Sequence, residues 1–294
     1  MTHWAQRAGL RRSEWICVVF FCYIICLWPF FRDGPHLRFQ PLWIALSVFA
    51  FLFGLNRLER GKWALGIHRF RDWLPIALTF TAFQEMELFL PRHFPHHYEA
   101  IWIKQDLTLL QTWRLQRAIE SFGPVVPFYL EFCYLLVYGF PFYCIGILYA
   151  RHLRRYVDAF FVIYLAGTLG AYALFPFFPS QPPRLLYPNV AMPHFISWVR
   201  SFNLFILYKG SIHVSVFPSA HVSSAFSAAW AMFFIQPRRK VLGWILMLYA
   251  VSVSLATIYG RYHYTADVLA GMGVSIVTSF FCMLALQRFR KSGE

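Results

Sequence analysis

Eight long apolar runs constrain this 294-residue chain more than any other feature. A helix needs about 20 apolar residues to cross a hydrocarbon core of about 30 Å. With 59% hydrophobic and 14% charged residues, the chain is far more apolar than a soluble protein. The pattern predicts an all-α, polytopic transmembrane bundle of about eight spans. The predicted spans are residues 14–31, 41–56, 72–90, 126–150, 156–178, 218–236, 240–259 and 265–287.

Two longer polar segments lie between these runs. The segment 91–124 has spaced apolar residues, which predicts a helix in the membrane interface with Trp102 and Trp113 as aromatic anchors. The segment 179–217 contains an amphipathic stretch near 195–208. Neither segment has the composition of a linker, so we expect one membrane domain.

The basic residues indicate an orientation. The chain has 27 Lys and Arg against 13 Asp and Glu, a net charge of +14. A cytoplasmic N-terminus puts 17 basic residues inside and 10 outside, so the positive-inside rule predicts both termini in the cytoplasm. The basic residues are distributed over alternate helix ends and do not gather on one soluble face, which argues against a nucleic-acid partner. The ten outside are Arg32, Arg38, Arg92, Lys104, Arg114, Arg117, Arg184, Arg200, Lys209 and Arg261, and the seventeen inside are Arg7, Arg11, Arg12, Arg57, Arg60, Lys62, Arg69, Arg71, Arg151, Arg154, Arg155, Arg238, Arg239, Lys240, Arg288, Arg290 and Lys291.

The six cysteines lie inside apolar runs and show no C-x-x-C spacing. Buried free cysteine behaves as a small hydrophobic residue, so neither a disulfide framework nor a zinc site is expected. The first apolar run ends without a small-residue cleavage site, which favours a retained span over a signal peptide.

Three polar segments are predicted at the same, outer end of different spans: residues 178–184, 217–221 and 261–267. Ionisable side chains at membrane depth are costly, so their default interpretation is functional. His263 and Asp267 are four residues apart and share a helix face. A carboxylate bonded to one imidazole nitrogen leaves the other nitrogen free as a nucleophile or base.

The other two segments supply anion-binding groups. Pro218 and Ser219 are typical of a helix start, whose free N–H groups bind phosphate, and His221 in that first turn can protonate a leaving oxygen. Arg184 and Arg261 add guanidinium groups suited to phosphoryl oxygens. Together these side chains describe phosphoryl transfer without a metal, and no cofactor is expected.

These segments resemble the three signature motifs of the type 2 phosphatidic acid phosphatase superfamily, in its inositolphosphorylceramide-synthase-like (inositolphosphotransferase) branch. The P-S-x-H motif matches at 218–221, the H-x-x-x-D motif at 263–267, and Pro182-Pro183-Arg184 is similar to that branch's first motif. The resemblance covers roughly residues 120–285. It implies a six-helix catalytic core, a phosphohistidine on His263, His221 as general acid, Asp267 orienting His263, and phosphate held by Arg184 and Ser219. We therefore place the catalytic transmembrane core at 124–294, and the N-terminal spans and interfacial helix at 1–123, within one integrated domain.

Two positions depart from the broader superfamily pattern. Its lysine seven residues before the first-motif arginine is Phe177 here, and its arginine six residues before the nucleophilic histidine is Thr257. Arg261 is our candidate to replace the lost charge. The departures favour the lipid phosphotransferase branch over a simple phosphatase.

The sequence thus predicts an integral membrane phosphotransferase or phosphatase acting on a lipid-linked phosphate ester at the outer leaflet. One alternative is plain hydrolysis, by a phosphatidate or undecaprenyl diphosphate type of phosphatase. Another is an inactive lipid-binding transporter or scaffold that keeps the phosphate pocket. The expected partners are a lipid phosphate and the membrane, and no residue pattern specifies an oligomeric state.

Structural roles compete with several of these assignments. Arg184 and Arg261 can instead anchor the chain at the membrane interface. Ser219 can serve solely as the cap of its helix, without binding phosphate. Glu85, Glu87 and Glu131 either line a head-group cavity or pair with an arginine or the backbone. The histidine-rich loop has two interpretations, a metal site and an exposed interfacial loop. We favour the exposed loop because prolines interrupt the possible ligands His93, His96, His97 and Glu99.

Overall fold

The computed structural model describes residues 9–31, 39–61, 64–91, 93–210, 212, 214 and 216–291. For residues 289–291 it describes the backbone without the side chains. All regular elements in these ranges are helical, which confirms the predicted all-α class. The α-helices are α1 (Arg12–Leu27), α2 (Gln40–Leu58), α3 (Ala64–Met86), α4 (His97–Leu107), α5 (Leu115–Glu120), α6 (Val125–Leu136), α7 (Phe140–Ala150), α8 (Val157–Tyr172), α9 (Pro183–Leu186), α10 (Trp198–Gly210), α11 (Ala220–Ile235), α12 (Val241–Tyr259) and α13 (Thr265–Lys291). Short 3₁₀ turns occupy Trp28–Phe31, Glu87–Phe89, Val137–Gly139, Arg154–Tyr156 and Phe175–Phe177, and a π turn occupies Thr108–Thr112.

Six helical segments of the described chain are long and apolar enough to cross a membrane, as a multi-pass membrane protein requires. They coincide with six of the predicted spans. The other two predicted spans, 72–90 and 218–236, form α3 and α11. α11 has only 16 residues, and α3 carries several charged residues along its 23. The six segments are Arg12–Phe31, Gln40–Leu58, Val125–Ala150, Arg154–Phe177, Val241–Tyr259 and Thr265–Arg288.

The predicted span 126–150 is interrupted near its middle. A 3₁₀ turn at Val137–Gly139 joins α6 to α7, and Pro141 lies in the first turn of α7. Because proline has no N–H, it is tolerated at a helix start but breaks the hydrogen-bond ladder of a helix interior. The sequence therefore starts a new helix here instead of continuing the old one.

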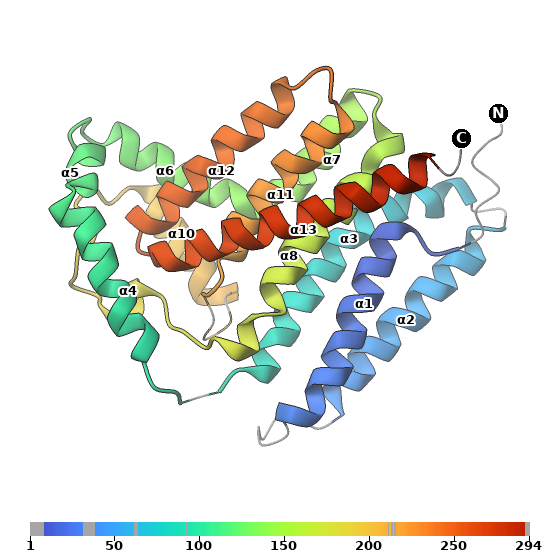
Figure 1. The fold of residues 1–294 in the computed structure, drawn as a ribbon, viewed down its shortest axis with the longest axis horizontal. Coiled ribbons are helices and arrows are strands. Elements are labelled where there is room, and N and C mark those ends of the chain that lie inside the picture. Colours follow the sequence, from blue (N-terminus) through green and yellow to red (C-terminus); the bar gives the residue numbers. More distant parts are fainter. Residues whose placement is uncertain are drawn as a thin grey trace.

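α8 and α11 form the centre of the bundle, packed on each other and on α13, with α12 on the other side of α11 (Figure 1). Small residues permit this close approach. The Ser223 hydroxyl donates to the Gly167 carbonyl at 2.8 Å, and the Ser227 and Ser275 hydroxyls are 2.9 Å apart. At the start of α11, a Cβ added to Gly271 of α13 would lie 2.4 Å from the Ser219 carbonyl oxygen. The small residues of α11 thus permit its close contacts with α8 and α13.

The N-terminal helices pack against the outer side of α8. α1 and α3 both contact α8, and α2 contacts α1 and α3. Where α1, α2, α3, α7 and α8 meet, charged side chains form what we call the arginine–carboxylate cluster. It consists of Arg11, Glu14, Glu59, Arg71, Asp72 and Arg154.

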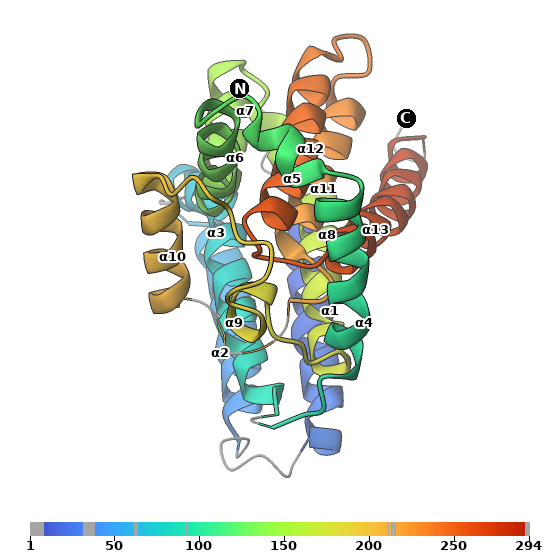
Figure 2. The same cartoon turned by 90° about the vertical axis from the view of Figure 1, so that its left-hand side faces the viewer.

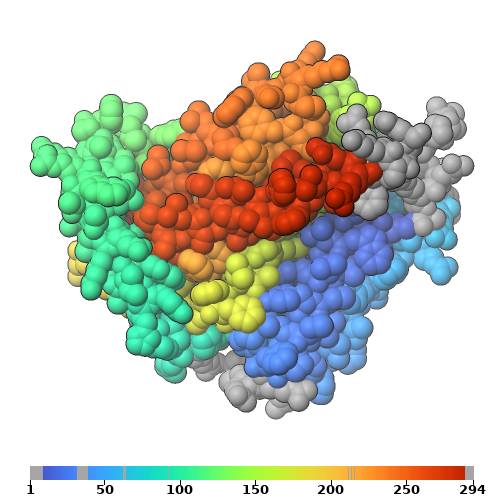
Figure 3. All heavy atoms as spheres, in the orientation of Figure 1, coloured from blue at the N-terminus to red at the C-terminus, as the bar shows by residue number. Residues whose placement is uncertain are grey.

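At the far end of the bundle, α4, α5 and α10 surround the segments that carry the motifs (Figure 2). Trp113 is exposed, as an interfacial anchor requires, whereas Trp102 stacks on Phe217 with ring centroids 5.0 Å apart. Trp102 therefore has a packing contact within the fold, and the anchoring of the two tryptophans in a membrane interface stays a prediction. The amphipathic stretch of the second loop forms α10. Figure 3 shows α13 running across one face of the molecule, where its exposed side chains include Leu269, Ile276 and Phe280.

Orientation in the membrane stays a prediction. Of the basic residues that support it, Arg7, Arg32, Arg38, Lys62, Arg92 and the side chains of Arg290 and Lys291 lie outside the described part of the structure. The division of the chain at residues 123 and 124 also stays a prediction.

Candidate functional site

The three motif segments converge through backbone hydrogen bonds. The Arg184 amide donates to the Arg261 carbonyl at 3.1 Å, and the Ser219 amide donates to the Asp267 carbonyl at 2.9 Å. The third segment is therefore the hub to which the first and second are attached. This convergence is what the predicted topology requires, since each segment lies at the same end of its helix.

The two motif histidines contact each other. Nδ1 of His221 lies 3.3 Å from Nε2 of His263. Nδ1 of His263 lies 3.0 Å from the Val216 carbonyl oxygen, which fixes this nitrogen as the protonated one and leaves a lone pair on Nε2. Burial, then the electrostatic effects of His221 and of the Arg184 guanidinium, hold the pKa of His263 well below its usual value, against the smaller opposing effect of the Val216 carbonyl. His263 therefore presents a neutral imidazole whose free nitrogen faces His221.

Asp267 lies beside His263 but is not its closest acceptor. Its Oδ2 is 3.4 Å from Nδ1 of His263 and accepts the Tyr264 amide at 2.8 Å, at the start of α13. The Val216 carbonyl and Asp267 thus share the orientation of the imidazole. Residue patterns miss Val216 because its contribution is a backbone carbonyl.

Arg184 lies next to both histidines without a counter-ion. Its guanidinium carbon is 5.7 Å from the centre of the Tyr262 ring, and Nη1 is 3.4 Å from the Tyr262 carbonyl oxygen. No carboxylate of the described residues lies within 4 Å of it. An unneutralised guanidinium beside a neutral imidazole pair is the charge arrangement that a phosphate requires.

Arg261 is held differently. Its backbone adopts the left-handed conformation (φ 62°), and Nη1 donates to Asp106 at 2.6 Å with both side chains fully buried. Nε and Nη2 have no partner among the described residues. Asp106 is therefore the counter-ion of Arg261, whose Nε and Nη2 keep unused donors, and the role of Arg261 as a phosphate ligand stays a prediction.

Ser219 acts as the cap of α11. Its hydroxyl accepts the Val222 amide at 3.4 Å, and the residue is buried. This is the structural role that the sequence left open beside phosphate binding, which stays a prediction.

The two positions that depart from the superfamily pattern have structural roles. Phe177 is exposed and packs edge-on against Phe31. Thr257 is buried, and its carbonyl accepts the amides of Tyr262 at 2.9 Å and His263 at 3.1 Å. Neither side chain provides a cation for the site.

Three carboxylates, of which the residue pattern singled out only Glu131, hold the loop around His263. Asp106 accepts the Thr265 amide and hydroxyl at 2.9 and 2.8 Å, in addition to Arg261. Glu120 accepts the Tyr259 hydroxyl at 3.0 Å. Glu131 accepts the Tyr262 hydroxyl of the same loop at 2.6 Å. The segment 259–265 is thus anchored at four residues by three acidic side chains.

Glu131 resolves one open alternative, because it pairs with an arginine. Nη1 of Arg200 donates to it at 2.6 Å and also to the Gly260 carbonyl, while the Asn203 amide donates to Glu131 at 2.9 Å. This buried network attaches α10 to α6 and to the loop. Glu85, in contrast, is buried in α3 with no partner among the described atoms.

The histidine-rich loop contributes one ion pair, His96 to Glu99 at 3.0 Å. Within the described ranges, no group of three or more His, Cys, Asp or Glu side chains is placed to hold a metal ion. Glu99 also accepts the Gln181 amide at 3.1 Å, so it supports the first motif segment.

Comparison with known proteins adds the family. A PA-phosphatase related-family protein of Dictyostelium discoideum is 28% identical over 137 residues, which is 44% of this chain and 22% of that protein. The chain therefore matches only about a fifth of this relative. No solved structure matches this chain. The family model described as the PAP2 superfamily matches residues 103–281, more than half of the chain and all three motif segments. The chain therefore belongs to the PAP2 superfamily.

Proposed function

We propose that the chain transfers or hydrolyses the phosphoryl group of a lipid-linked phosphate ester through a phosphohistidine at His263. The observation that carries this proposal is the pair of imidazoles in contact beside Arg184. A neutral imidazole with a free Nε2 is a nucleophile, the second histidine is within proton-transfer distance, and the unneutralised guanidinium attracts a phosphate.

The reaction follows from these positions. The phosphate takes the place of the contact between Nε2 of His263 and Nδ1 of His221, so the two rings move apart, and its charge favours the protonated form of His221. Nε2 attacks phosphorus, so the N–P bond forms as the bond to the alkoxide oxygen breaks, and His221 gives its proton to that oxygen. Arg184 and the N-terminal dipole of α11 stabilise the charge on the transferring group.

The second step regenerates the histidines. Water or the hydroxyl of another lipid or polyol gives its proton to His221 and attacks the phosphohistidine. The N–P bond then breaks, which releases phosphate or a new ester. The acceptor alone separates a phosphatase from an inositolphosphotransferase-like transferase in this scheme.

Phosphate labelling tests the proposal directly. Purified protein incubated with ³²P-labelled phosphatidate should carry acid-labile label, and His263→Ala should lose both label and turnover. His97→Ala, which removes an exposed histidine of α4, should keep both. Turnover near the native rate in His263→Ala would refute the assignment. Free phosphate as product indicates a phosphatase, and a new phosphodiester lipid in the presence of inositol or ceramide acceptors indicates a transferase.

We also propose that the site faces the outer leaflet, with both termini in the cytoplasm. The support is the excess of basic residues at the other helix ends. A cysteine introduced at Phe122, an exposed residue directly after α5, should react with a membrane-impermeant thiol reagent added outside intact cells. A cysteine at Arg239 should not, and the reverse labelling pattern would invert the topology.

A further inference from the structure

Two tyrosines at the junction of α6 and α7 lie against His221. Tyr134 belongs to the last turn of α6, and Tyr138 belongs to the 3₁₀ turn that follows it. Their ring centroids lie 5.3 and 5.7 Å from the centroid of the His221 ring, and the Tyr138 ring is nearly perpendicular to it, at 83°. These are the distances of aromatic rings in contact. His221 therefore contacts two phenols in addition to His263.

The turn that carries Tyr138 is fixed by packing on α12. Cys133 and Val137 form a buried apolar cluster with Val253 of α12, and the half-buried ring of Tyr138 packs against this cluster. Closely packed side chains keep one position, because any other rotamer would lose these contacts or clash with them. The position of the Tyr138 ring beside His221 is therefore set by the fold.

The hydroxyl of Tyr138 is the unusual feature of this contact. It is buried and makes no hydrogen bond of normal geometry with a described residue, although the Tyr134 phenol is close to it. A buried hydroxyl normally has a partner, because burial removes its hydrogen bonds to water. The neighbouring phenol of Tyr262 follows this rule and donates to Glu131 at 2.6 Å. Tyr138 thus has a donor that the described protein groups do not use.

Arg184 lies near the same hydroxyl. Its guanidinium interacts electrostatically with the Tyr138 phenol and with the imidazoles of His221 and His263. These four side chains therefore surround one region of the site. Guanidinium and hydroxyl groups both donate well to phosphate oxygens, and neither donor group is neutralised here by a described carboxylate.

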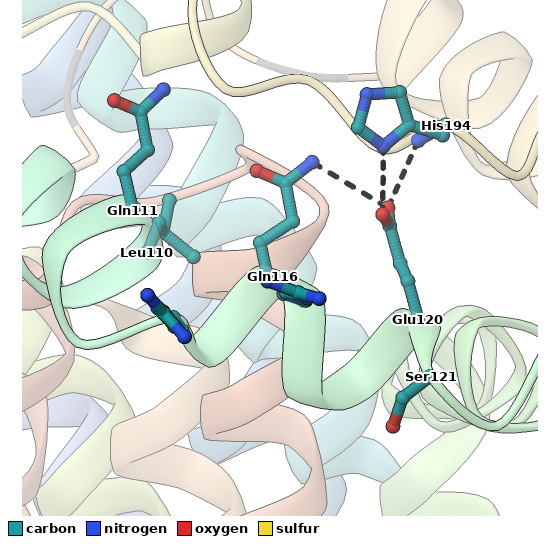
Figure 4. Close-up of a pocket in the computed structure, with 8 residues that line it drawn as sticks. Leu110, Gln111, Gln116, Glu120, Ser121 and His194 are labelled. Atoms are coloured by element: carbon teal, nitrogen blue, oxygen red, sulfur yellow. Dashed lines mark hydrogen bonds and ion pairs between the residues drawn. The ribbon is translucent and has the colours of Figure 1, made fainter.

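The surface pocket beside α5 has no such connection with the histidines. It has a volume of about 550 Å³, and Figure 4 shows Gln116 and His194, two of its lining residues, directed at Glu120. Within the described ranges, none of its lining residues shares a hydrogen bond or an ion pair with either motif histidine. The junction of α6 and α7, in contrast, contacts His221 directly.

We propose that Tyr138 is a catalytic residue whose hydroxyl donates a hydrogen bond to a non-bridging oxygen of the phosphoryl group while His263 attacks it. The hydroxyl keeps its proton and stabilises the charge on that oxygen, and His221 remains the group that protonates the leaving alkoxide. Tyr138 is thus a neutral donor in a site where neither Phe177 nor Thr257 provides a cation. The inference rests on the proposed function, because it adds a donor to the same phosphoryl transfer.

Tyr138→Phe tests this inference because it removes the hydroxyl and keeps the ring. We expect kcat/KM for a lipid phosphate to fall about 10–100-fold, the usual effect of losing one hydrogen bond to a charged group. The denaturation midpoint should stay native, since the hydroxyl has no normal hydrogen bond to lose. Tyr143→Phe, which changes an exposed tyrosine of α7, is the matched control and should keep both values. Native kcat/KM in Tyr138→Phe refutes the inference, and so does a loss of activity that a matching loss of stability explains.

Equilibrium binding of inorganic phosphate separates this inference from the proposed function, because it needs no turnover. The affinity of the purified protein should be about tenfold lower in Tyr138→Phe than in Tyr143→Phe. The same ratio should appear when both changes are made in His263→Ala, which cannot form a phosphohistidine. Label and turnover that persist in His263→Ala refute the proposed function, while a tenfold difference between the tyrosine variants still supports Tyr138 as a phosphate ligand. Equal phosphate affinity of the two tyrosine variants overturns the inference even if His263 carries the phosphoryl group.

Discussion

Buried and half-buried arginines at the two ends of the bundle have different electrostatic environments. In the arginine–carboxylate cluster, Nε of Arg71 donates to Glu14 at 2.7 Å, and Arg71 also contacts Glu59. Arg11 and Arg154 both donate to Asp72, each at 2.7 Å. Every one of these arginines therefore has a carboxylate partner.

Three arginines also lie at the motif end, but only two of them have a carboxylate partner. Arg200 is paired with Glu131 and Arg261 with Asp106, whereas Arg184 contacts only the ring and the carbonyl of Tyr262. α8, about 24 Å long, connects the two ends, since Asp158 in its first turn accepts from Ser13 and its far end leads to Arg184. The comparison teaches that a structural charge is neutralised within the fold and that the charge left without a counter-ion is the one available to a substrate.

Arg71→Ala should break the cluster end most strongly. The substitution leaves Glu14, which is 1% exposed, and Glu59 without their common partner. Loss of one partner from a buried ion pair costs about 3–5 kcal/mol of unfolding free energy. Denaturant titration of the purified protein in detergent measures this loss. Arg69→Ala, on the exposed side of the same helix, is the matched control and should change stability by less than about 0.5 kcal/mol. Equal stability of the two variants would show that the cluster does not support the fold.

Arg184→Ala should show the opposite pattern. We expect kcat/KM for a lipid phosphate to fall about 10²–10³-fold, the usual effect of removing one group that stabilises transition-state charge, while the unfolding free energy stays close to that of the native protein. Arg184→Lys should recover part of the activity because it restores the charge without the two-nitrogen geometry. Steady-state kinetics and denaturant titration on the same preparations check both halves. A variant that loses stability as Arg71→Ala does, and keeps its activity, would reverse the roles of the two ends.

The sequence predicts the helices and the motif positions well because both are local properties. Apolar runs of the length of a span require nothing from the rest of the chain, and Ser219 caps α11 only three residues from the amide it accepts. The placement of the histidines side by side follows from the topology once three segments occupy the same end of their helices.

The partners of the charged residues could not be predicted, because they are distant in sequence. Asp106 and Arg261 are 155 residues apart, and Glu131 and Arg200 are 69 residues apart. A sequence shows that a charge is present but not which opposite charge reaches it. The same limit applies to Trp102, because its stacking partner Phe217 lies far along the chain.

Backbone groups are a second reason for the gap. The Val216 carbonyl orients His263, and the Thr257 carbonyl accepts its amide. Any residue type provides a carbonyl, so these contacts leave no signal in the residue pattern. At Thr257, where the superfamily pattern suggests a missing cation, the position instead shapes the loop that holds His263.

The smallest expected effect concerns pH, and it links the free charge of Arg184 to His263. An unfolded histidine has a pKa of about 6.5, whereas burial first, then the electrostatic effects of His221 and of Arg184, hold the pKa of His263 well below that value in the fold. Below pH 6.5 the unfolded chain therefore binds a proton that the folded site refuses. The contribution of this group to the unfolding free energy is therefore fully present above this pH. It falls as the pH decreases toward the folded pKa, with a slope of at most about 1.4 kcal/mol per pH unit.

Unfolding titrations between pH 5.5 and 7.5 measure that slope. His263→Gln, which cannot titrate, should be less steep than the native protein. Arg184→Ala should lie between the two, because removing the guanidinium raises the pKa of His263 toward its usual value without removing the effect of burial. Arg69→Ala, which removes an exposed charge of α3, should keep the native slope. If Arg184→Ala also keeps the native slope, the charge of Arg184 does not act on His263, and the distinction between a neutralised and a free arginine loses its functional meaning.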